Sequence, residues 1–547
     1  MLLTCSPPPP PRIAEQDDEC DTVDKFSIFI DWLRASGGNH EQLTLQKYAD
    51  EMRGVHATRD VAPDETICTI PLKCLITVEM GKSTEVGRKV SMHNLQLDAP
   101  KHVYVMLFML MDMQDPESFF RPYYDVLPET LNSMPVFWSE EELSWLQGSY
   151  MVSQTRDRKD AIARDYRNIC GIAPEFESAV TLQQFIWARM IVCSRNFGII
   201  VNGLRTSAMV PYADMLNHLR PRECKWEFED DIQAFTITSL EHMKAGAQVY
   251  DSYGKKCNYR FLLNYGFAME NNIEADGSSP NEFSVCFEES RSGATDPLAE
   301  ERFGLWRVLP PMQQVHSKRL RLDANVRSAP ARQAFAILRV LNANAAEMAH
   351  MKAPAATPEF PSRRRPSAQE PMSLRNEIAM LHALRDLMAS MLAAYPRTLE
   401  EDDKMLAEDT TLEPFSNQRH ALLLVRGEKQ VLRYYADFAS KCLEVLAIES
   451  PVERGAAAAR LTGQQDRPSQ AAGVHLNEDL GAMLSSDTAD ADFRSFEELI
   501  RPGVPSAAEG ESVEIGGGLV KRVIRQPAGP ASAFPPTEFC TVAAHYW

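Results

Sequence analysis

The hydrophobic periodicity of this chain changes twice within its first 290 residues. Short strand candidates separated by turn residues occupy residues 54–71, a helical period follows from about residue 82 to 205, and strand patterns return at residue 207. Side chains repeat every two residues in a strand and every 3.6 residues in a helix, so the period is the main sequence indicator of structure type. A helical block between two β-rich segments predicts one domain with an insert at about 82–205, not three separate domains.

The strand candidates come in pairs with turn residues between them. "GVHATRDV" and "ETICTIP" are joined by Pro63-Asp64, and "KWEFE" and "IQAFTIT" flank Asp230-Asp231. Proline presets the backbone of a turn and aspartate stabilises one through its side chain, so the second pair predicts a hairpin. "EHMKAGAQVYDSYG" then repeats the strand–turn–strand pattern of "TRDVAPDETI".

The helical segments carry their apolar residues on one face. "TLQQFIWARMIVCSRNF" shows this spacing with Leu182, Phe185, Ile186, Met190 and Ile191. "HVYVMLFMLM", closed by Asp112, predicts a buried helix, because it is too short to cross a bilayer. Before the strands, "KFSIFIDWLRASGG" predicts a short amphipathic helix that two glycines terminate.

Beyond about residue 296 the periodicity is helical almost throughout. Two long amphipathic segments, "SLRNEIAMLHALRDLMASMLAAY" and "NQRHALLLVRGEKQVLRYYADFASKCLEVL", dominate it, and Thr398 with Glu401 predicts a capping box between them. We therefore expect a second, all-helical domain at 296–450. Residues 1–24 are rich in proline and acidic residues and predict disorder, and small and polar residues at 451–547 predict a low-complexity tail.

Composition narrows the classes of function. The chain has 547 residues and a formal net charge of −19, which argues against nucleic-acid binding and favours a cationic partner. Its 11 cysteines include no CxxC pair, so they predict reduced thiols of an intracellular protein, cytoplasmic or nuclear, and no zinc framework. With no signal peptide pattern and no apolar run of membrane length, we expect no membrane association, and we expect a monomer.

Two stretches hold the candidate functional residues. In "PYADMLNHLRPRECKWEFED", Asp214, Asn217 and His218 lie together just before an extended segment. If they are buried, each needs a partner, because an unpaired polar group away from water costs about 2–7 kcal/mol. They either stabilise a turn or bind a ligand. In "QVYDSYGKKCNYRFLLNYGFAMENN", Tyr253-Gly254 alone is weak evidence for a site.

The ordered combination of motifs is specific. The strand–turn–strand "TRDVAPDETI", then "SRNF", "DMLNH", "DSYGKKCN" and "NYGF", resembles the SET-domain protein methyltransferases. The resemblance covers about residues 25–450 and favours the branch of the Rubisco large-subunit lysine methyltransferase and the actin-histidine methyltransferase. It implies an α+β chain: a β-rich SET fold with a knot-like crossing over residues 25–290, split by the helical insert, then an all-α substrate-binding domain.

The resemblance also implies roles for individual residues. Asn217 and His218 are expected to contact S-adenosylmethionine, with Asp214 just upstream, and Arg195 to bind the carboxylate of that cofactor. The remaining expected cofactor contacts are Glu65, Thr66 and Ile67, largely through their backbone, and Tyr265 and Phe267 as pocket walls.

The chemistry implied by the resemblance needs neither a nucleophilic side chain nor a metal. Tyr253 matches the active-site tyrosine of the family and is expected to align the attacking amine. Phe197 stands where the actin-histidine branch carries an asparagine, which favours lysine as the acceptor. The zinc-binding cysteine segment of many histone enzymes is missing, which favours a non-histone protein substrate.

Two other functions stay open at this point. Histidine methylation of an actin-like target is the alternative within the same class, and a catalytically silent SET fold that serves as a binding scaffold is the alternative outside it. We further expect the helical domain to present the protein substrate, and its removal from about residue 300 to spare cofactor binding.

Overall fold

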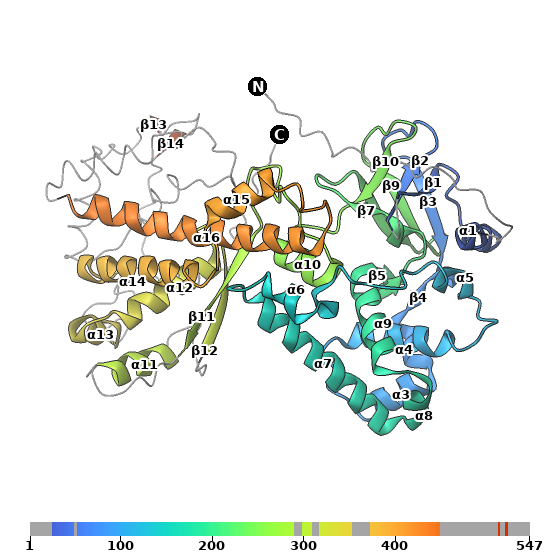
Figure 1. Ribbon diagram of the computed structural model, residues 1–547, viewed down its shortest axis with the longest axis horizontal. Helices are drawn as coiled ribbons and strands as arrows, with labels where there is room; N and C mark the ends of the chain where they lie inside the picture. The colour runs from blue at the N-terminus through green and yellow to red at the C-terminus, as the bar shows by residue number, and fades with distance from the viewer. Residues whose placement is uncertain are drawn as a thin grey trace, which may run out of the picture.

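A computed structural model describes residues 24–48, 52–288, 298–308, 317–352, 372–448, 512–514 and 520–522. The predicted N-terminal disorder and C-terminal tail therefore lie outside the described residues, apart from Asp24 and two short paired strands, β13 (Ser512–Glu514) and β14 (Val520–Arg522). The described chain forms two lobes, one with most of the strands and one almost entirely helical (Figure 1).

Three small sheets make up the first lobe. In the first, β1 (Leu43–Lys47), β2 (Arg53–Ala57), β10 (Gln248–Asp251) and β7 (Asn217–His218) lie in that order. The second consists of β3 (Thr66–Pro71), β9 (Ala234–Ser239) and β8 (Cys224–Glu229), and the third of β4 (Ile76–Thr77), β6 (Leu204–Met209) and β5 (Asn196–Val201). Each sheet thus joins strands that precede the helical block to strands that follow it.

The helical block fills the sequence between these strands. It consists of α2 (Val78–Ser83), α3 (Glu85–Met92), α4 (Pro100–Asp112), α5 (Arg121–Tyr124), α6 (Glu140–Ser144), α7 (Met151–Ile172), α8 (Pro174–Ala179) and α9 (Leu182–Arg195). A reciprocal capping box starts α9, with Thr181 Oγ1 accepting from Gln184 N over 3.3 Å and Thr181 N donating to Gln184 Oε1 over 2.9 Å. The predicted buried helix is α4, and the predicted amphipathic N-terminal helix is α1 (Lys25–Ala35).

The helical block ends ten residues earlier than the periodicity predicts. The chain leaves α9 at Arg195 and forms the hairpin of β5 and β6. Asn202 and Gly203 connect the strands with φ of +49° and +77°, the pair of positive angles that a two-residue type I′ turn requires. This Asn-Gly pair was the sequence signal for the hairpin, and the helical reading of 196–205 was wrong.

The second lobe contains the predicted long helices. They are α12 (Ala329–Leu341), α14 (Leu374–Leu392), α15 (Leu399–Glu408) and α16 (Asn417–Leu446), together with α11 (Ala299–Val308) and α13 (Ala345–Lys352). The predicted capping box of Thr398 and Glu401 starts α15.

One strand of this lobe was not predicted. β12 (Ser317–Asp323) pairs antiparallel with β11 (Glu282–Glu288), the last strand before the lobe. Leu320 and Leu322 are buried in β12 and alternate with charged residues, and this period of two was the signal. The described residues of the C-terminal lobe are therefore helical except for one strand.

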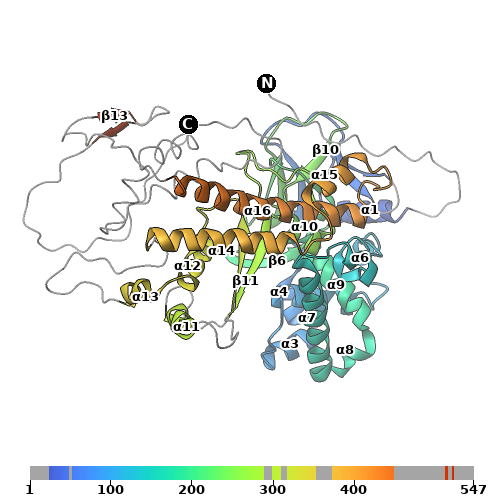
Figure 2. The ribbon, with the colours of Figure 1, turned by 60° about the vertical axis from the view of Figure 1, so that its left-hand side comes forward.

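Hydrophobic packing joins the two lobes. The main core lies under the three sheets and the helical block. A second cluster fills the C-terminal lobe, but it also contains Tyr259, Leu262 and Leu263 of α10 (Asn258–Tyr265) and Leu146 and Met151 near the start of α7. α16 lies across α10 in both ribbon views (Figures 1 and 2). This shared core argues against the expectation that removal from about residue 300 spares cofactor binding.

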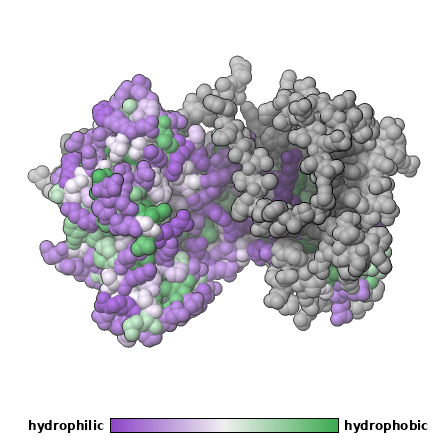
Figure 3. Space-filling view, turned by 180° about the vertical axis from the view of Figure 1, so that it is seen from behind, coloured by the Kyte–Doolittle hydropathy of each residue, from purple (hydrophilic) through white to green (hydrophobic). Residues whose placement is uncertain are grey.

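The face seen from behind is mostly polar where its residues are described (Figure 3). Seen from behind, the coloured part of the molecule is largely hydrophilic, and its apolar residues form small separate patches (Figure 3). Among the described residues, no helix combines the length and apolar composition that a membrane crossing needs.

Candidate active site

The polar run singled out in the sequence begins with a strained residue. Tyr212 has a φ of +75° and a ψ of −49°, and its buried ring stacks on His40 with centroids 4.6 Å apart. A non-glycine residue in such a conformation costs about 1–3 kcal/mol and persists only where the surrounding packing fixes it. The short helix η3 (Ala213–Met215) and then β7 follow directly, so this packing fixes the approach to Asn217 and His218.

Two segments far apart in the sequence, those of β7 and β10, come together here. β7 pairs parallel with β10, with Asn217 opposite Tyr250 and His218 opposite Asp251. Asn217 also donates from Nδ2 to the backbone carbonyl of Arg53 over 2.8 Å. The amide therefore ties β7 to the strand on the far side of β10, and its role toward a cofactor stays a prediction.

Tyr253 is held where these two segments meet by both its backbone and its side chain. Its hydroxyl donates to the carbonyl oxygen of Leu216 over 2.8 Å, and its backbone N–H donates to His218 Nδ1 over 2.9 Å. Gly254 follows with a φ of +89°, which lets the chain turn away at once. Burial raises the pKa of Tyr253 above its ordinary value, so the hydroxyl stays protonated and is a hydrogen-bond donor, not a base.

His218 is neutral and presents one unmatched donor. Because Nδ1 accepts from Tyr253, the proton of the neutral ring lies on Nε2. Burial lowers the pKa of His218 to about 4, and Arg220 acts in the same direction. Nε2 is itself buried and has no hydrogen-bond partner among the described residues. A buried donor of this kind fits an acceptor atom of a bound molecule.

Five rings surround this point, and we call them the aromatic enclosure: His218, Tyr253, Phe261, Tyr265 and Phe267. Tyr253 lies between His218 and Tyr265, with ring centroids 5.0 and 4.8 Å away and nearly parallel planes. Phe267 stacks on Phe261 at 5.0 Å. The sequence motifs predicted four of these residues and missed Phe261, which lies on the inner face of α10.

Arg195 and Asp214 form a buried ion pair next to the enclosure. Arg195 Nη1 donates to Asp214 O over 2.9 Å and to Asp214 Oδ2 over 3.1 Å. Tyr123, which the sequence did not indicate, donates its hydroxyl to the same Oδ2 over 2.8 Å. The side chain of Asp214 is fully buried, and its Oδ1 has no partner among the described residues. Asp214 therefore orients Arg195 through one oxygen and leaves the other unsatisfied.

Three further predicted residues, Glu65, Thr66 and Ile67, lie at the sheet of β3, β9 and β8 and not at the sheet that contains β7 and β10. Glu65 pairs with Arg59 and accepts the backbone N–H of Ala62 over 3.1 Å. Thr66 begins β3, and the pairing with β9 is irregular at Ile67, which is buried. The described contacts of these three residues are therefore with the β3–β9 sheet and its turn, and their role toward a cofactor stays a prediction.

Phe197 lies on β5 in a second group of rings. It contacts Trp226 at 5.3 Å and Phe235 at 5.1 Å between centroids, both edge-on. These contacts fix the ring of Phe197 against the hairpin of β8 and β9. Its predicted place in an acceptor channel stays a prediction.

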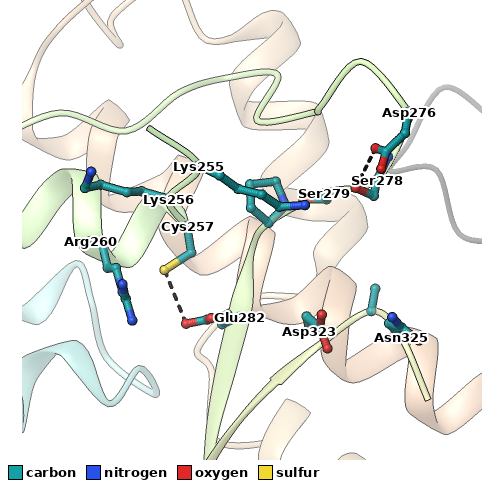
Figure 4. A pocket seen from close by; sticks show the side chains of 12 residues that line it. Lys255, Lys256, Cys257, Arg260, Asp276, Ser278, Ser279, Glu282, Asp323 and Asn325 are labelled. Carbon is teal, nitrogen blue, oxygen red and sulfur yellow. Dashed lines mark hydrogen bonds between the residues drawn. The ribbon is translucent and has the colours of Figure 1, made fainter. Parts of the chain in front are cut away.

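A cavity of about 440 Å³ opens just beyond Tyr253, where the two lobes meet. Lys255, Lys256 and Arg260 approach it from the segment after Tyr253, whereas Glu282 and Asp323 come from β11 and β12 (Figure 4). Lys256 Nζ donates to the carbonyl oxygen of Tyr253, so this wall is connected to the enclosure. The sequence did not indicate this cavity, because one wall is the unpredicted strand β12. No group of His, Cys, Asp and Glu side chains in the described ranges could hold a metal ion.

Two family models match the chain, one for each lobe. The SET domain model matches residues 52–254, and the Rubisco LSMT substrate-binding model matches residues 293–432. The first match ends at Gly254, directly after Tyr253, and the second contains the whole of α12 and α14.

Curated relatives and solved structures agree with these matches. The actin-histidine N-methyltransferase of Xenopus tropicalis is 26% identical over 428 residues, which cover 75% of this chain and 69% of the relative. The human protein of that name is 25% identical over 428 residues, 75% of this chain and 67% of the relative.

Among solved structures, the SET domain of LSMT bound to lysine and AdoHcy has a TM-score of 0.64 at 23% identity, covering 82% of this chain and 98% of that chain. Rubisco LSMT bound to AdoMet has a TM-score of 0.62 at 22% identity, with coverages of 78% and 93%. These structures establish the fold. The two domain matches show that the chain combines a SET domain with a Rubisco LSMT substrate-binding domain, and over most of its length it is similar to the actin-histidine N-methyltransferases and to Rubisco LSMT.

Proposed function

We propose that the chain transfers a methyl group from S-adenosylmethionine to the side-chain amine of a lysine in a protein substrate. The observation that carries this proposal is the fixed position of Tyr253. Its hydroxyl is protonated, desolvated and anchored on Leu216, and its ring lies between His218 and Tyr265.

The unsatisfied polar atoms around Tyr253 fit such a cofactor. His218 Nε2 offers a buried donor and Asp214 Oδ1 a buried acceptor, and neither has a partner among the described residues. S-adenosylmethionine carries both acceptors and an ammonium donor, so it can satisfy both kinds of atom. Asn217, His218 and Arg195 would hold it, and Tyr265 and Phe267 would wall its site. The Rubisco LSMT structures with the same fold contain AdoMet or AdoHcy.

When bound, the cofactor supplies a sulfonium methyl group that an amine takes up by direct displacement. The contribution of the protein is to orient and desolvate the two reactants. Tyr253 can help to orient them, because its hydroxyl oxygen keeps a free lone pair while its proton is engaged with Leu216. That lone pair complements positive charge on the transferring methyl and aligns the acceptor nitrogen.

Lysine is the proposed acceptor because of the aromatic group around Phe197. The rings of Phe197, Trp226 and Phe235 suit an aliphatic lysine stem, and a ring face attracts the ammonium by about 0.5–2 kcal/mol. Phe197 has no hydrogen-bonding atom for an imidazole. Histidine is the second candidate, since the curated relatives are named actin-histidine methyltransferases.

A protein is the proposed substrate because the second lobe matches a substrate-binding family. The cavity beyond Tyr253 has walls from both lobes and side chains of both charges. A polypeptide segment next to the acceptor residue would find partners there.

The experiment is methyl transfer from S-adenosylmethionine labelled in its methyl group to the proteins of a cell lysate. The matched control is Tyr253→Phe, which keeps the ring and removes only the hydroxyl. The proposal is supported if the wild-type chain labels a protein and the Tyr253→Phe control labels it much less. Tight binding of the cofactor with no transfer to any protein would instead identify a binding scaffold.

A further inference from the structure

The first turns of α16 contact the first lobe at several points. Asn417 Nδ2 donates to Asn132 O and Glu142 Oε1, each over 2.9 Å, and Arg419 pairs with Glu270 over 3.0 Å. Glu428 accepts a hydrogen bond from Ser149 over 2.9 Å. A helix that only presents a substrate needs none of these contacts.

His420 makes the contact that adjoins the aromatic enclosure in the sequence. Its Nδ1 accepts the backbone N–H of Ala268 over 3.1 Å, and both residues are buried. Burial lowers the pKa of His420 to about 4, with Arg419 acting in the same direction, so the ring is neutral and Nδ1 remains an acceptor. Ala268 directly follows Phe267 of the aromatic enclosure, and Tyr265 is three residues before it.

The segment at 265–269 is also held on both sides of Ala268. Gly266 has a φ of +80°, and a Cβ added there would lie 2.3 Å from Ser133 Oγ, so the turn after α10 needs glycine. Asn258 of α10 holds Met269 through two hydrogen bonds of 2.9 and 3.0 Å. Between these two points, His420 provides the hydrogen bond that fixes the backbone directly after Phe267.

We propose that His420, on the C-terminal domain, is a positioning residue of the active site, because its hydrogen bond to Ala268 holds Phe267 and Tyr265 against Tyr253. This inference rests on the proposed function for its effect on catalysis. The C-terminal domain then has a second role besides substrate binding, since it completes the wall of the site in which the methyl group is transferred.

The test compares two substitutions of His420 in the full chain. His420→Asn places an acceptor oxygen the same number of bonds from the backbone as Nδ1, whereas His420→Leu fills similar space without an acceptor and leaves the Ala268 N–H buried and unpaired. The control for general loss of stability is Phe438→Leu, a substitution in the same helix that is fully buried against Phe335, away from the first lobe.

Three quantities are measured on each variant: amide hydrogen exchange of the peptide that contains Ala268, the Kd for S-adenosylmethionine, and the initial rate of methyl transfer to lysate protein. We expect His420→Leu to speed exchange at Ala268 and to lower the transfer rate by about tenfold or more, since small displacements in a site are costly. His420→Asn should stay within about twofold of the wild type. Phe438→Leu should lower the thermal midpoint without changing exchange at Ala268.

Two results would overturn the inference: a wild-type Ala268 amide that exchanges as fast as an exposed loop, or a His420→Leu variant with wild-type exchange and rate. If His420→Leu does not fold, the wild-type exchange measurement still decides. A wild-type chain that binds no S-adenosylmethionine would refute the proposed function, and the exchange comparison would still show whether His420 orders Ala268.

Discussion

The hydroxyl of Tyr253 and the backbone carbonyl of Leu216 are joined by a hydrogen bond of 2.8 Å. This contact connects the residue before Asn217 and His218 to a residue 37 positions later in the chain. The same tyrosine also donates its backbone N–H to His218, so two hydrogen bonds from Tyr253 fasten the two segments to each other. The tyrosine is therefore both part of the fold and, in our proposal, the catalytic residue.

Replacing Tyr253 by Phe separates these two roles. The ring stays, so the stacking on His218 and Tyr265 and the affinity for S-adenosylmethionine should persist. Loss of one hydrogen bond should lower the free energy of unfolding by only about 1 kcal/mol. The rate of methyl transfer should fall by about 100-fold, as for other single groups that act mainly in a transition state. Single-turnover kinetics beside urea unfolding checks both numbers, and an unchanged rate would leave Tyr253 a packing residue.

Asn217→Ala tests the cofactor site. The substitution removes the donor to the Arg53 carbonyl and, in our proposal, a contact to S-adenosylmethionine. We expect the cofactor affinity to weaken by about 1–3 kcal/mol, because polar groups are left unpaired. Calorimetric titration of the folded variant measures this. A variant that loses thermal stability but binds the cofactor with wild-type affinity would show that Asn217 only ties β7 to β2.

Glu428 predicts a specific pH dependence of stability. Its oxygens accept from Ser149 and from Tyr395, each over 2.9 Å, and burial raises its pKa from 4.5 to about 7. In the unfolded chain the carboxyl group ionises near 4.5. The stability that the protonated group contributes is therefore fully present below that pH and is lost as the pH rises through about 7, by up to roughly 3 kcal/mol.

Glu428→Gln removes this titration and nearly keeps the shape of the side chain. The free energy of unfolding, measured in urea at pH 5.5, 6.5 and 7.5, should fall with rising pH more steeply for the wild type than for the variant. Parallel profiles of the two proteins would mean that the carboxyl group ionises normally in the folded state.

Truncation should show that the two lobes share a core. A chain that ends at residue 448 retains the described helices of the second lobe and should keep cofactor binding and methyl transfer. A chain that ends at residue 297 exposes Leu262 and Leu263 of α10, each worth about 1.5–3 kcal/mol when buried, and loses His420. We expect this shorter chain to lose cofactor binding as well as transfer. Wild-type cofactor affinity in the shorter chain would contradict this expectation and show that the first lobe folds without the second.

Phe197→Asn tests the choice of acceptor. The substitution breaks the ring contacts with Trp226 and Phe235 and introduces a hydrogen-bonding amide. Transfer to lysine should fall, and transfer to histidine should rise relative to it, because a site with a matched hydrogen bond discriminates strongly between acceptors. Phe197→Leu is the control for lost packing without a new amide. An equal change in product ratio in both variants would show that Phe197 acts only through packing.

Local patterns in the sequence were sufficient for much of the fold. The capping residue Thr398 and the apolar faces of α9, α14 and α16 predicted these helices, because their signals lie within a few neighbouring residues. The ordered motifs predicted that Asn217, His218, Tyr253, Tyr265 and Phe267 come together. For these residues the resemblance supplied the long-range information that periodicity lacks.

The features of the site that the sequence could not predict are contacts between distant segments. His420 and Ala268 are 152 positions apart, and nothing near either residue indicates the hydrogen bond between them. Tyr123 reaches Asp214 in the same way, from 91 positions away. The hairpin at Asn202-Gly203 and the alternation in β12 were different cases. Their signals were present, but they lie next to longer segments with a helical period.

The most direct test of the account is the identity of the methylated residue. Lysate proteins treated with the wild-type chain and S-adenosylmethionine are digested, and the modified peptides are sequenced by mass spectrometry against the Tyr253→Phe control. We predict methyl-lysine that appears with the wild type and is strongly reduced with the control. Methylhistidine as the product, with lysines unmodified, would contradict the role given to Phe197, and no modified peptide at all would contradict the proposed transfer.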